Sequence, residues 1–216
     1  HRPEEIRDIF ERSFADFQNL RAGKKGRADI WRDFRKHLDF LRQEGFVDEK
    51  DRLTDDGMWA SRLRLDQPLL IAECLKKKVF PERDMALLCA MIAPFVYDRE
   101  LDIPVKRKET PRKLRQAFDR MVVSLGPLVK RVREAGFDVS PLPFWTSVIL
   151  YDWARGMDWE DVRARWRISD GDLAMLISRT ADNLHQVAAL RESHPEMAIL
   201  AEEGRQAVLR EPVVFE

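Results

Sequence analysis

The sequence is poor in the residues that mark several common classes of protein. It has only two cysteines, Cys74 and Cys89, too few for a disulfide-stabilised scaffold, and both fall in apolar helical patterns typical of buried thiols. No apolar run approaches the ~18 residues that a membrane-spanning helix needs. The charged start, HRPEEIRDIF, is unlike a signal peptide. These absences predict a reducing, cytoplasmic setting without membrane contact, and a start at His1 instead of Met suggests processing or a piece of a longer protein.

The sequence also lacks a net charge. Lys plus Arg and Asp plus Glu both number 38, which counts against a uniformly basic nucleic-acid-binding protein. Ordinary numbers of glycine (9) and proline (11) exclude collagen-like and low-complexity chains. An apolar fraction of 44% suffices for a globular core. The total says nothing, however, about how the charge is distributed along the chain.

The motifs of a self-contained enzyme are absent from the sequence. It has no phosphate loop of the form G-x-x-x-x-G-K-[ST], no acidic metal-binding box, no G-x-G-x-x-G and no G-x-S-x-G. The four histidines, at positions 1, 37, 185 and 194, have no metal-ligand spacing, and His37 and His185 are expected on helix surfaces. We therefore expect no catalytic residue, metal site or cofactor in this chain.

Apolar residues recur at steps of three and four along most of the sequence, which predicts a mainly α fold. Pro195 stands where a helix begins, and Gly45 and Gly136 stand where helices end. The predicted helices cover about residues 3–20, 28–44, 55–65, 68–80, 82–97, 111–135, 144–155, 159–166, 170–191 and 195–210. The predicted domains are a helix at 1–22, a winged-helix-like module at 23–66 and a helical domain at 67–216.

One short stretch departs from the helical pattern. Phe46 and Val47 precede a charged tip, DEKDR, and Leu53 follows it, which predicts a small β-hairpin. Thr54 is a good N-cap for the next helix, because two aspartates follow it. Helix, hairpin and helix in this order are typical of a winged-helix module. The sequence therefore predicts such a module, with its small β-hairpin, followed by a helical bundle.

The charges are unevenly distributed. Between residues 106 and 133, ten basic residues accompany only Glu109 and Asp119, whereas the segment after Arg191 is acidic. Basic helices can contact phosphates, although a run of charge is as readily a solvated helix face. The candidate phosphate contacts are Lys106, Arg107, Lys108, Arg112, Lys113 and Arg115.

The helix expected at 170–191 carries two stripes of residues. The apolar stripe consists of Leu173, Leu176, Ile177, Thr180, Leu184 and Val187. The second stripe, at spacings of four, three and four, consists of Met175, Arg179, Asp182 and Gln186. Such a mixture can stack on bases and form hydrogen bonds with them, so these four are candidate nucleic-acid-binding residues. From spacing alone, a solvent-exposed face with an Arg–Asp pair is the simpler interpretation.

Seven segments, taken in order, resemble those of superkiller-type RNA helicases of superfamily 2, which include exosome-associated and HelY-like enzymes. The segments are SFADFQN (13–19), GFVDEKDRLTDDGMWASRL (45–63), PLLIAECLKKKVF (68–80), ERDMALLCAMIAPFV (82–96), YDWARGMDWEDV (151–162), ISDGDLAMLISRTADNL (168–184) and VLREPV (208–213). The resemblance covers nearly the whole chain.

The resemblance implies that the chain is the C-terminal region of an ATP-dependent RNA helicase, with a winged helix and a helical DSHCT domain that closes over the RNA. A long ratchet helix lines the channel in that family. Segment 168–184 matches its start, which implies that Arg179 and Asp182 face the bases. The implied partners are single-stranded RNA, or DNA, and the RecA-like motor domains of the same protein, which would bind ATP and Mg²⁺.

Some residues depart from the family pattern. Met175 belongs to a stretch where the family often has a basic residue, and Lys78 stands where a glycine is usual. Only about 20 residues separate the SFADFQN segment from the winged-helix core. The large arch insertion is therefore expected to be missing, as in compact bacterial-type relatives. Neither RecA-like domain is part of the sequence.

Two other functions remain open. The segment LRQEGFVDEKDRLTDDG resembles the wing of winged-helix transcription regulators, and WEDVRARWRISDGDLAMLISR fits a helix-turn-helix. A regulator of this kind would bind duplex DNA as a symmetric dimer. The other alternative is a helical protein-interaction module whose basic faces bind an acidic partner.

Overall fold

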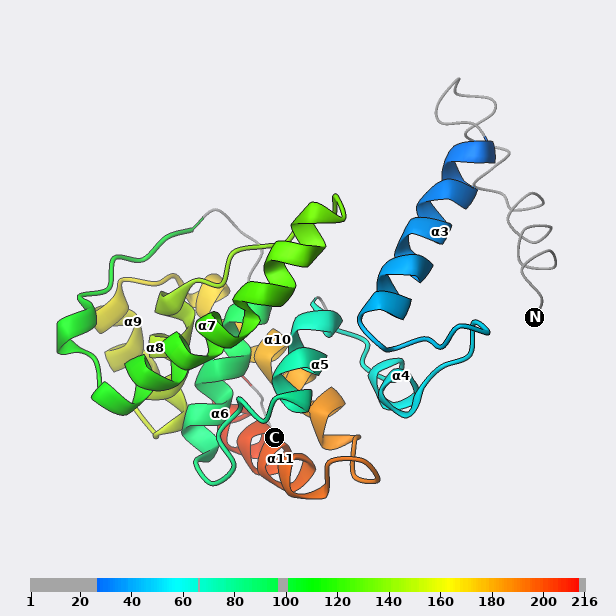
Figure 1. The fold of residues 1–216 in the computed structure, drawn as a ribbon. Helices are drawn as coiled ribbons and strands as arrows, with labels where there is room; N and C mark the ends of the chain where they lie inside the picture. The colour runs from blue at the N-terminus through cyan, green and yellow to red at the C-terminus, as the bar shows by residue number, and fades with distance from the viewer. Residues whose placement is uncertain (1–26, 66, 97–100, 214–216) are drawn as a thin grey trace. The chain divides into compact units, whose positions relative to one another are not determined.

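The computed structural model describes residues 27–65, 67–96 and 101–213, and its chain divides into two compact units. The first unit ends at Met58 and the second begins at Trp59, and each unit is described by itself. Figure 1 shows the elements in chain order from blue to red. Helices prevail in these ranges, which contain no β-strand, so the prediction of a mainly α fold is confirmed. The helix expected at 1–22 lies outside the described residues.

The first unit contains α3 (Arg27–Gln43), which ends as predicted at Gly45. This glycine has a φ of 77°, a left-handed conformation that favours a residue without Cβ. Its N–H donates to the Arg42 carbonyl at 3.0 Å, and the N–H of Phe46 donates to the Leu41 carbonyl at 2.9 Å. These two bonds form the Schellman end that stops the helix.

The prediction of a two-stranded β-hairpin after this helix is wrong. A single antiparallel bridge joins Val47 to Leu53, with no strand on either side in the part of the chain that is described. Two backbone hydrogen bonds join the arms, from the Asp48 N–H to the Arg52 carbonyl at 2.8 Å and from the Thr54 N–H to the Phe46 carbonyl at 3.1 Å. The Asp48 carboxylate also accepts the N–H groups of Lys50 at 2.8 Å and Arg52 at 2.9 Å, so the arms are too short to form a regular ladder. Leu53 is 47% exposed, so burial does not hold the second arm in place.

The helix that follows, α4 (Asp55–Ala60), begins as predicted and ends earlier than predicted. The Thr54 hydroxyl accepts the N–H of Gly57 at 3.1 Å and donates to the Gly45 carbonyl at 2.7 Å. It therefore caps the helix and ties it to the end of α3. A Cβ at Gly57 would lie 2.0 Å from the Phe46 carbonyl oxygen, so this close approach requires glycine.

The second unit is a helical bundle, as the sequence predicts. Its elements are α5 (Pro68–Lys76), α6 (Met85–Ile92), η1 (Ala93–Phe95), η2 (Arg107–Glu109), α7 (Arg112–Glu134), α8 (Phe144–Ala154), α9 (Trp159–Trp166), α10 (Asp170–Ala188) and α11 (Pro195–Val208). Among the residues placed in the structure, no helix combines the length and the apolar character that crossing a membrane requires.

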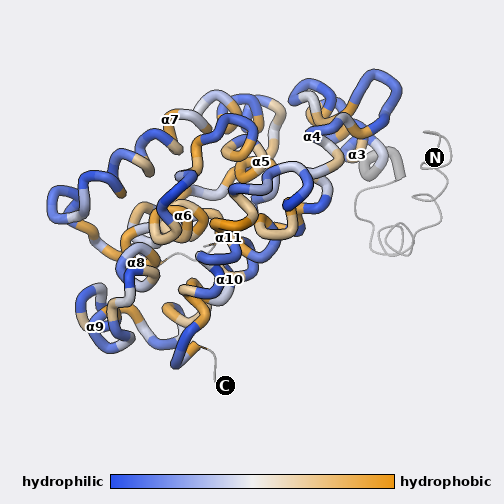
Figure 2. Tube along the Cα trace, turned by 90° about the horizontal axis from the view of Figure 1, so that it is seen from below, coloured by the Kyte–Doolittle hydropathy of each residue, from blue (hydrophilic) through white to orange (hydrophobic). Residues whose placement is uncertain are grey.

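Helix α6 forms the centre of this bundle. Every residue from Ala86 to Ile92 is buried, and the helix contacts α7, α8, α10 and α11. Figure 2 shows hydrophobic colouring along α6, whereas α7 carries blue along much of its length. The Asp84 carboxylate caps α6 by accepting the N–H of Leu87 at 2.9 Å. Pro94 ends the α-helix as predicted, because the chain passes there into η1.

Both cysteines are buried free thiols in this core, as the sequence predicts. Burial raises the pKa of Cys89 to about 12 and raises that of Cys74 far above its ordinary value. The sulfur of Cys89 leaves no room for a side chain at Gly204, where a Cβ would lie 2.9 Å away. These thiols serve packing, since a nucleophilic thiol needs a lowered pKa.

Candidate nucleic-acid interface

The start of α10 is fixed by its own cap and by α9. The Ser169 hydroxyl accepts the N–H of Asp172 at 3.1 Å and donates to the carboxylate of the same residue at 2.6 Å. The Asp170 carboxylate accepts the indole N–H of Trp159 at 2.8 Å and forms an ion pair with Arg163 at 2.8 Å. Acidic residues at this end also suit the helix dipole. Helix α9 thus holds the first turn of α10 in one orientation.

The predicted apolar stripe of α10 is buried, so that prediction is confirmed. The helix packs with this side on α11 and α6. The Thr180 hydroxyl donates to the Leu176 carbonyl at 2.7 Å, which satisfies a polar group in the core. The buried members of the predicted stripe are Leu173, Leu176, Ile177, Thr180, Leu184 and Val187.

The second stripe lies on the opposite side of α10, as helix geometry requires. Asp182 is exposed, whereas Met175, Arg179 and Gln186 are half-buried. Arg179 also takes part in an interaction within the chain. The structure thus brings the four residues together on one face and leaves one of them fully open. Their contact with bases stays a prediction.

One of the six predicted phosphate contacts, Arg115, has a clear role inside the fold. Its guanidinium donates to the carbonyls of Arg107 at 2.6 Å, Lys108 at 3.1 Å and Thr110 at 2.6 Å. These three carbonyls belong to η2 and to the residue after it, so the side chain ties this turn to α7. A guanidinium is suited to this task because its donors form a rigid fork.

Three more of the six are engaged in ion pairs. These are Lys106–Glu109 at 3.2 Å, Arg107–Asp119, and Lys113–Asp84 at 2.7 Å. The Arg107 guanidinium also lies 4.3 Å from the centre of the Phe144 ring. The hydrogen bond with Asp84 raises the pKa of Lys113. A phosphate at any of these cations would compete with a partner that is already present.

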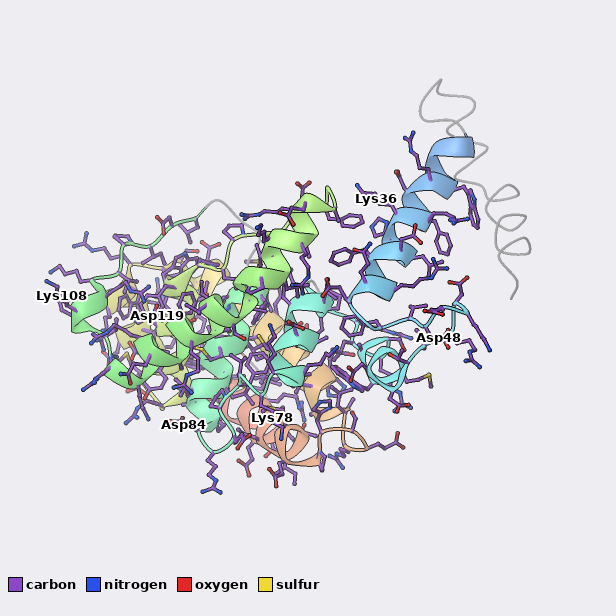
Figure 3. The ribbon with its side chains drawn as sticks, viewed as in Figure 1. Lys36, Asp48, Lys78, Asp84, Lys108 and Asp119 are labelled. Atoms are coloured by element: carbon purple, nitrogen blue, oxygen red, sulfur yellow. The ribbon has the colours of Figure 1, made fainter. Side chains whose placement is uncertain are left out.

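The remaining two, Lys108 and Arg112, are exposed and form no ion pair with any residue in the described ranges. Figure 3 shows Lys108 at the outer edge of the second unit, close to the start of α7. Arg120 and Arg133, further along α7, are likewise exposed and unpaired within those ranges. The helical period could have singled out Arg120, because it shares the solvent side of α7 with Arg112. These free cations therefore lie on η2 and along the outer face of α7.

A comparison with known families decides where this bundle belongs. The model described as "DSHCT (NUC185) domain" matches residues 50–216. The chain belongs to this family. The DSHCT domain is a domain of superkiller-type helicases and is consistent with a helicase C-terminal region. No curated protein matches the chain.

The DSHCT domain has a left-handed residue at a position where the resemblance implies a glycine. Lys78, labelled in Figure 3, has a φ of 51°. Its N–H donates to the Leu75 carbonyl at 3.1 Å, and the N–H of Val79 donates to the Cys74 carbonyl at 2.9 Å. This is the same Schellman end that glycine forms after α3, so a glycine would suit the backbone here as well.

Proposed function

We propose that this DSHCT domain forms one wall of the nucleic-acid channel of an ATP-dependent RNA helicase related to compact, HelY-like bacterial enzymes. Helix α10 would be the ratchet helix that contacts single-stranded RNA. The observation that carries the proposal is the division of α10 into a buried apolar side and an opposite side with Met175, Arg179, Asp182 and Gln186.

Each of these four side chains can do a different part of the binding. The Arg179 guanidinium can stack on a base or donate hydrogen bonds to it, and the Asp182 carboxylate can accept hydrogen bonds from base amino groups. The Met175 thioether offers a polarizable surface for stacking, and the Gln186 amide can donate and accept. Because every base has a π-face, such contacts tolerate changes of sequence.

The free cations near α7 would act on the backbone of the same strand. Lys108 and Arg112 have no carboxylate partner within the described ranges, so they can neutralise phosphates without breaking an ion pair. The energy for movement would come from RecA-like motor domains of the longer protein, which would hold ATP and Mg²⁺. Single-stranded DNA presents the same phosphates and bases, so preference between RNA and DNA depends on contacts to the 2′-hydroxyl.

The proposal is tested in the longer helicase that it requires, with Arg179→Ala. We expect RNA-stimulated ATP hydrolysis and unwinding to fall at least tenfold, while hydrolysis without RNA stays unchanged. The matched control is Arg191→Ala, an exposed arginine in the loop after α10. Unchanged unwinding and RNA stimulation in the Arg179 variant would overturn the ratchet assignment.

The alternatives predict different solution behaviour. A winged-helix regulator loses its main support because the hairpin is reduced to one bridge between Val47 and Leu53. It would still be revealed by a symmetric dimer in light scattering and by tight duplex binding. An interaction module would bind an acidic protein and have no affinity for RNA. A monomer that prefers single strands excludes both.

A further inference from the structure

A pocket of about 820 Å³ opens in the second unit, beside the start of α7. Its walls come from three places in the fold: η2 and the first turn of α7, the end of α8, and α9. No residue of α10 lines it, so it is separate from the proposed ratchet face. The volume falls within the range of pockets that hold small-molecule ligands.

Three cations from three different helical segments line this pocket. They are Lys113 of α7, Arg155 directly after α8, and Arg165 of α9. The floor includes Tyr151, whose side chain is buried and whose hydroxyl lies 3.2 Å from the Arg155 guanidinium. The Lys113 ammonium lies 5.5 Å from the centre of the same ring. Donors from separate segments thus converge on one tyrosine.

The carboxylates around the pocket are each paired with a cation. One further cation has no carboxylate partner. Asp84 pairs with Lys113 at 2.7 Å, and Asp152 pairs with Arg165 at 3.3 Å. Glu109, on the rim, pairs with Lys106 at 3.2 Å. Arg155 has no ion pair within the described ranges, and its guanidinium donates to the Tyr151 hydroxyl at 3.2 Å. The pocket therefore carries an uncompensated positive charge.

The backbone at the rim adds to this charge. Thr110 and Pro111 line the pocket and directly precede the first turn of α7, whose N–H groups form the positive end of the helix. The side chain of Arg165 is 49% exposed, so it can turn from Asp152 toward a ligand at little cost. An anion with several acceptor oxygens would pair with Arg155 and this helix end, and it would share Lys113 with Asp84.

We propose that this pocket binds the phosphate group of a nucleotide unit, either in an RNA strand or in a free nucleotide. Arg155 donates to the phosphate oxygens, Lys113 does so in competition with its ion pair to Asp84, and the remaining volume accommodates the sugar. In the RNA case the inference rests on the proposed function and adds a second contact point away from α10. In the free-nucleotide case it stands without that function.

The indole of Trp166 provides a reporter for this pocket. Its N–H donates to the Asp152 carboxylate at 3.0 Å, and this carboxylate lines the pocket. Its resonance in an NMR spectrum of the isotope-labelled full chain can be assigned with Trp166→Phe. The chain is titrated separately with uridine monophosphate, inorganic phosphate and a ten-nucleotide oligouridylate. We expect a saturable shift of this indole with uridine monophosphate, with the oligonucleotide, or with both.

We expect Arg155→Gln to bind the ligand that shifts the Trp166 indole at least tenfold more weakly. Arg165→Gln should also bind this ligand more weakly. The matched control Arg191→Gln, in the loop after α10 and outside the lining of the pocket, should bind as the wild type does. The spread of the other indole resonances shows that each variant is folded. The proposal is overturned if neither uridine monophosphate nor the oligonucleotide moves the Trp166 indole saturably, or if Arg155→Gln binds as tightly as the wild type.

The same titrations separate this inference from the proposed function. Binding of uridine monophosphate without binding of the oligonucleotide supports the pocket and counts against RNA binding by the chain. Oligonucleotide binding that is lost in Arg179→Ala but unchanged in Arg155→Gln supports the ratchet helix, and it overturns the pocket when uridine monophosphate does not shift the Trp166 indole either.

Discussion

The guanidinium of Arg210 lies over the ring of Trp153, 3.4 Å from its centre. The same guanidinium donates to the carbonyls of Trp153 at 3.1 Å and Met157 at 2.6 Å, and the Trp153 indole donates to the Val208 carbonyl at 2.9 Å. Burial lowers the pKa of Arg210. The residues after α11 are thus clamped onto the end of α8, which gives the closing VLREPV segment a structural role.

Removing this guanidinium should destabilise the second unit. We expect Arg210→Met to lower the free energy of unfolding by about 2–4 kcal/mol, because a desolvated cation–π contact and two hydrogen bonds to carbonyls are lost. The stability of Arg210→Lys should lie between those of the wild type and Arg210→Met, because lysine keeps the charge but lacks the forked donors of the guanidinium. Urea unfolding measures both. The exposed Arg191→Met should cost less than about 0.5 kcal/mol, and an equal loss in both methionine variants would contradict the clamp.

A glycine at position 78 should stabilise the chain. The left-handed backbone of Lys78 costs a residue with Cβ about 1–2 kcal/mol, of which the greater freedom of unfolded glycine offsets a part. Lys78→Gly should therefore raise the free energy of unfolding by about 0.5–1 kcal/mol in urea unfolding. Lys76→Gly, at the last residue of α5, should instead lower it, by up to about 1 kcal/mol. A loss of stability in both variants would show that the left-handed conformation is not strained.

Two arginines three residues apart should respond differently to loss of charge. Arg112 is exposed and unpaired within the described ranges, so Arg112→Gln should weaken single-stranded RNA binding and reduce the slope of log affinity against log salt by about one, without loss of stability. Arg115→Gln should instead lower the free energy of unfolding by about 2 kcal/mol, because three carbonyls lose their donor. Fluorescence anisotropy and urea unfolding measure the two effects. The reverse pattern would contradict the assignment.

The ion pair of Glu202 and Arg205 predicts a dependence of stability on pH. Hydrogen bonds from the Arg205 guanidinium at 2.7 and 3.0 Å lower the pKa of Glu202 from 4.5 to about 2. The folded chain holds this proton less tightly than the unfolded chain, so the contribution is complete above pH 4.5 and is lost as the pH falls to about 2. A carboxyl titration by NMR should find the low midpoint, and a midpoint near 4.5 would contradict it.

Stability measurements on variants check the same pair. Glu202→Gln should show a smaller loss of stability between pH 5 and pH 3 than the wild type, because the linked proton is gone. The exposed neighbour provides the control, since Glu203→Gln should keep the wild-type difference between the two pH values.

The local elements were predictable because their causes are local. The end of α3 at Gly45, the cap at Thr54 and the buried side of α10 follow from turn chemistry and the helical period. The prediction of a hairpin at 46–53 was wrong because three apolar residues do not specify two strands. The Asp48 carboxylate instead accepts backbone N–H groups of the tip.

The fate of the charged residues was not predictable, because their partners are distant in sequence. Lys113 is engaged by Asp84, 29 residues away, and Arg210 by the carbonyl of Trp153, 57 residues away. Spacing along one helix shows which cations share a face but cannot show which ones another helix neutralises. Only Lys108 and Arg112 of the six predicted phosphate contacts are left unpaired within the described ranges.

Site-specific photocrosslinking tests the central claim, that the open face of α10 contacts single-stranded RNA. A benzophenone amino acid replaces Asp182, whose exposed side chain leaves room for it, and in a second chain it replaces Glu203, exposed on α11. Each full chain is irradiated with a labelled oligouridylate. We expect crosslinks from position 182 and background levels from position 203. No crosslink at 182, or equal yields at both positions, would contradict it.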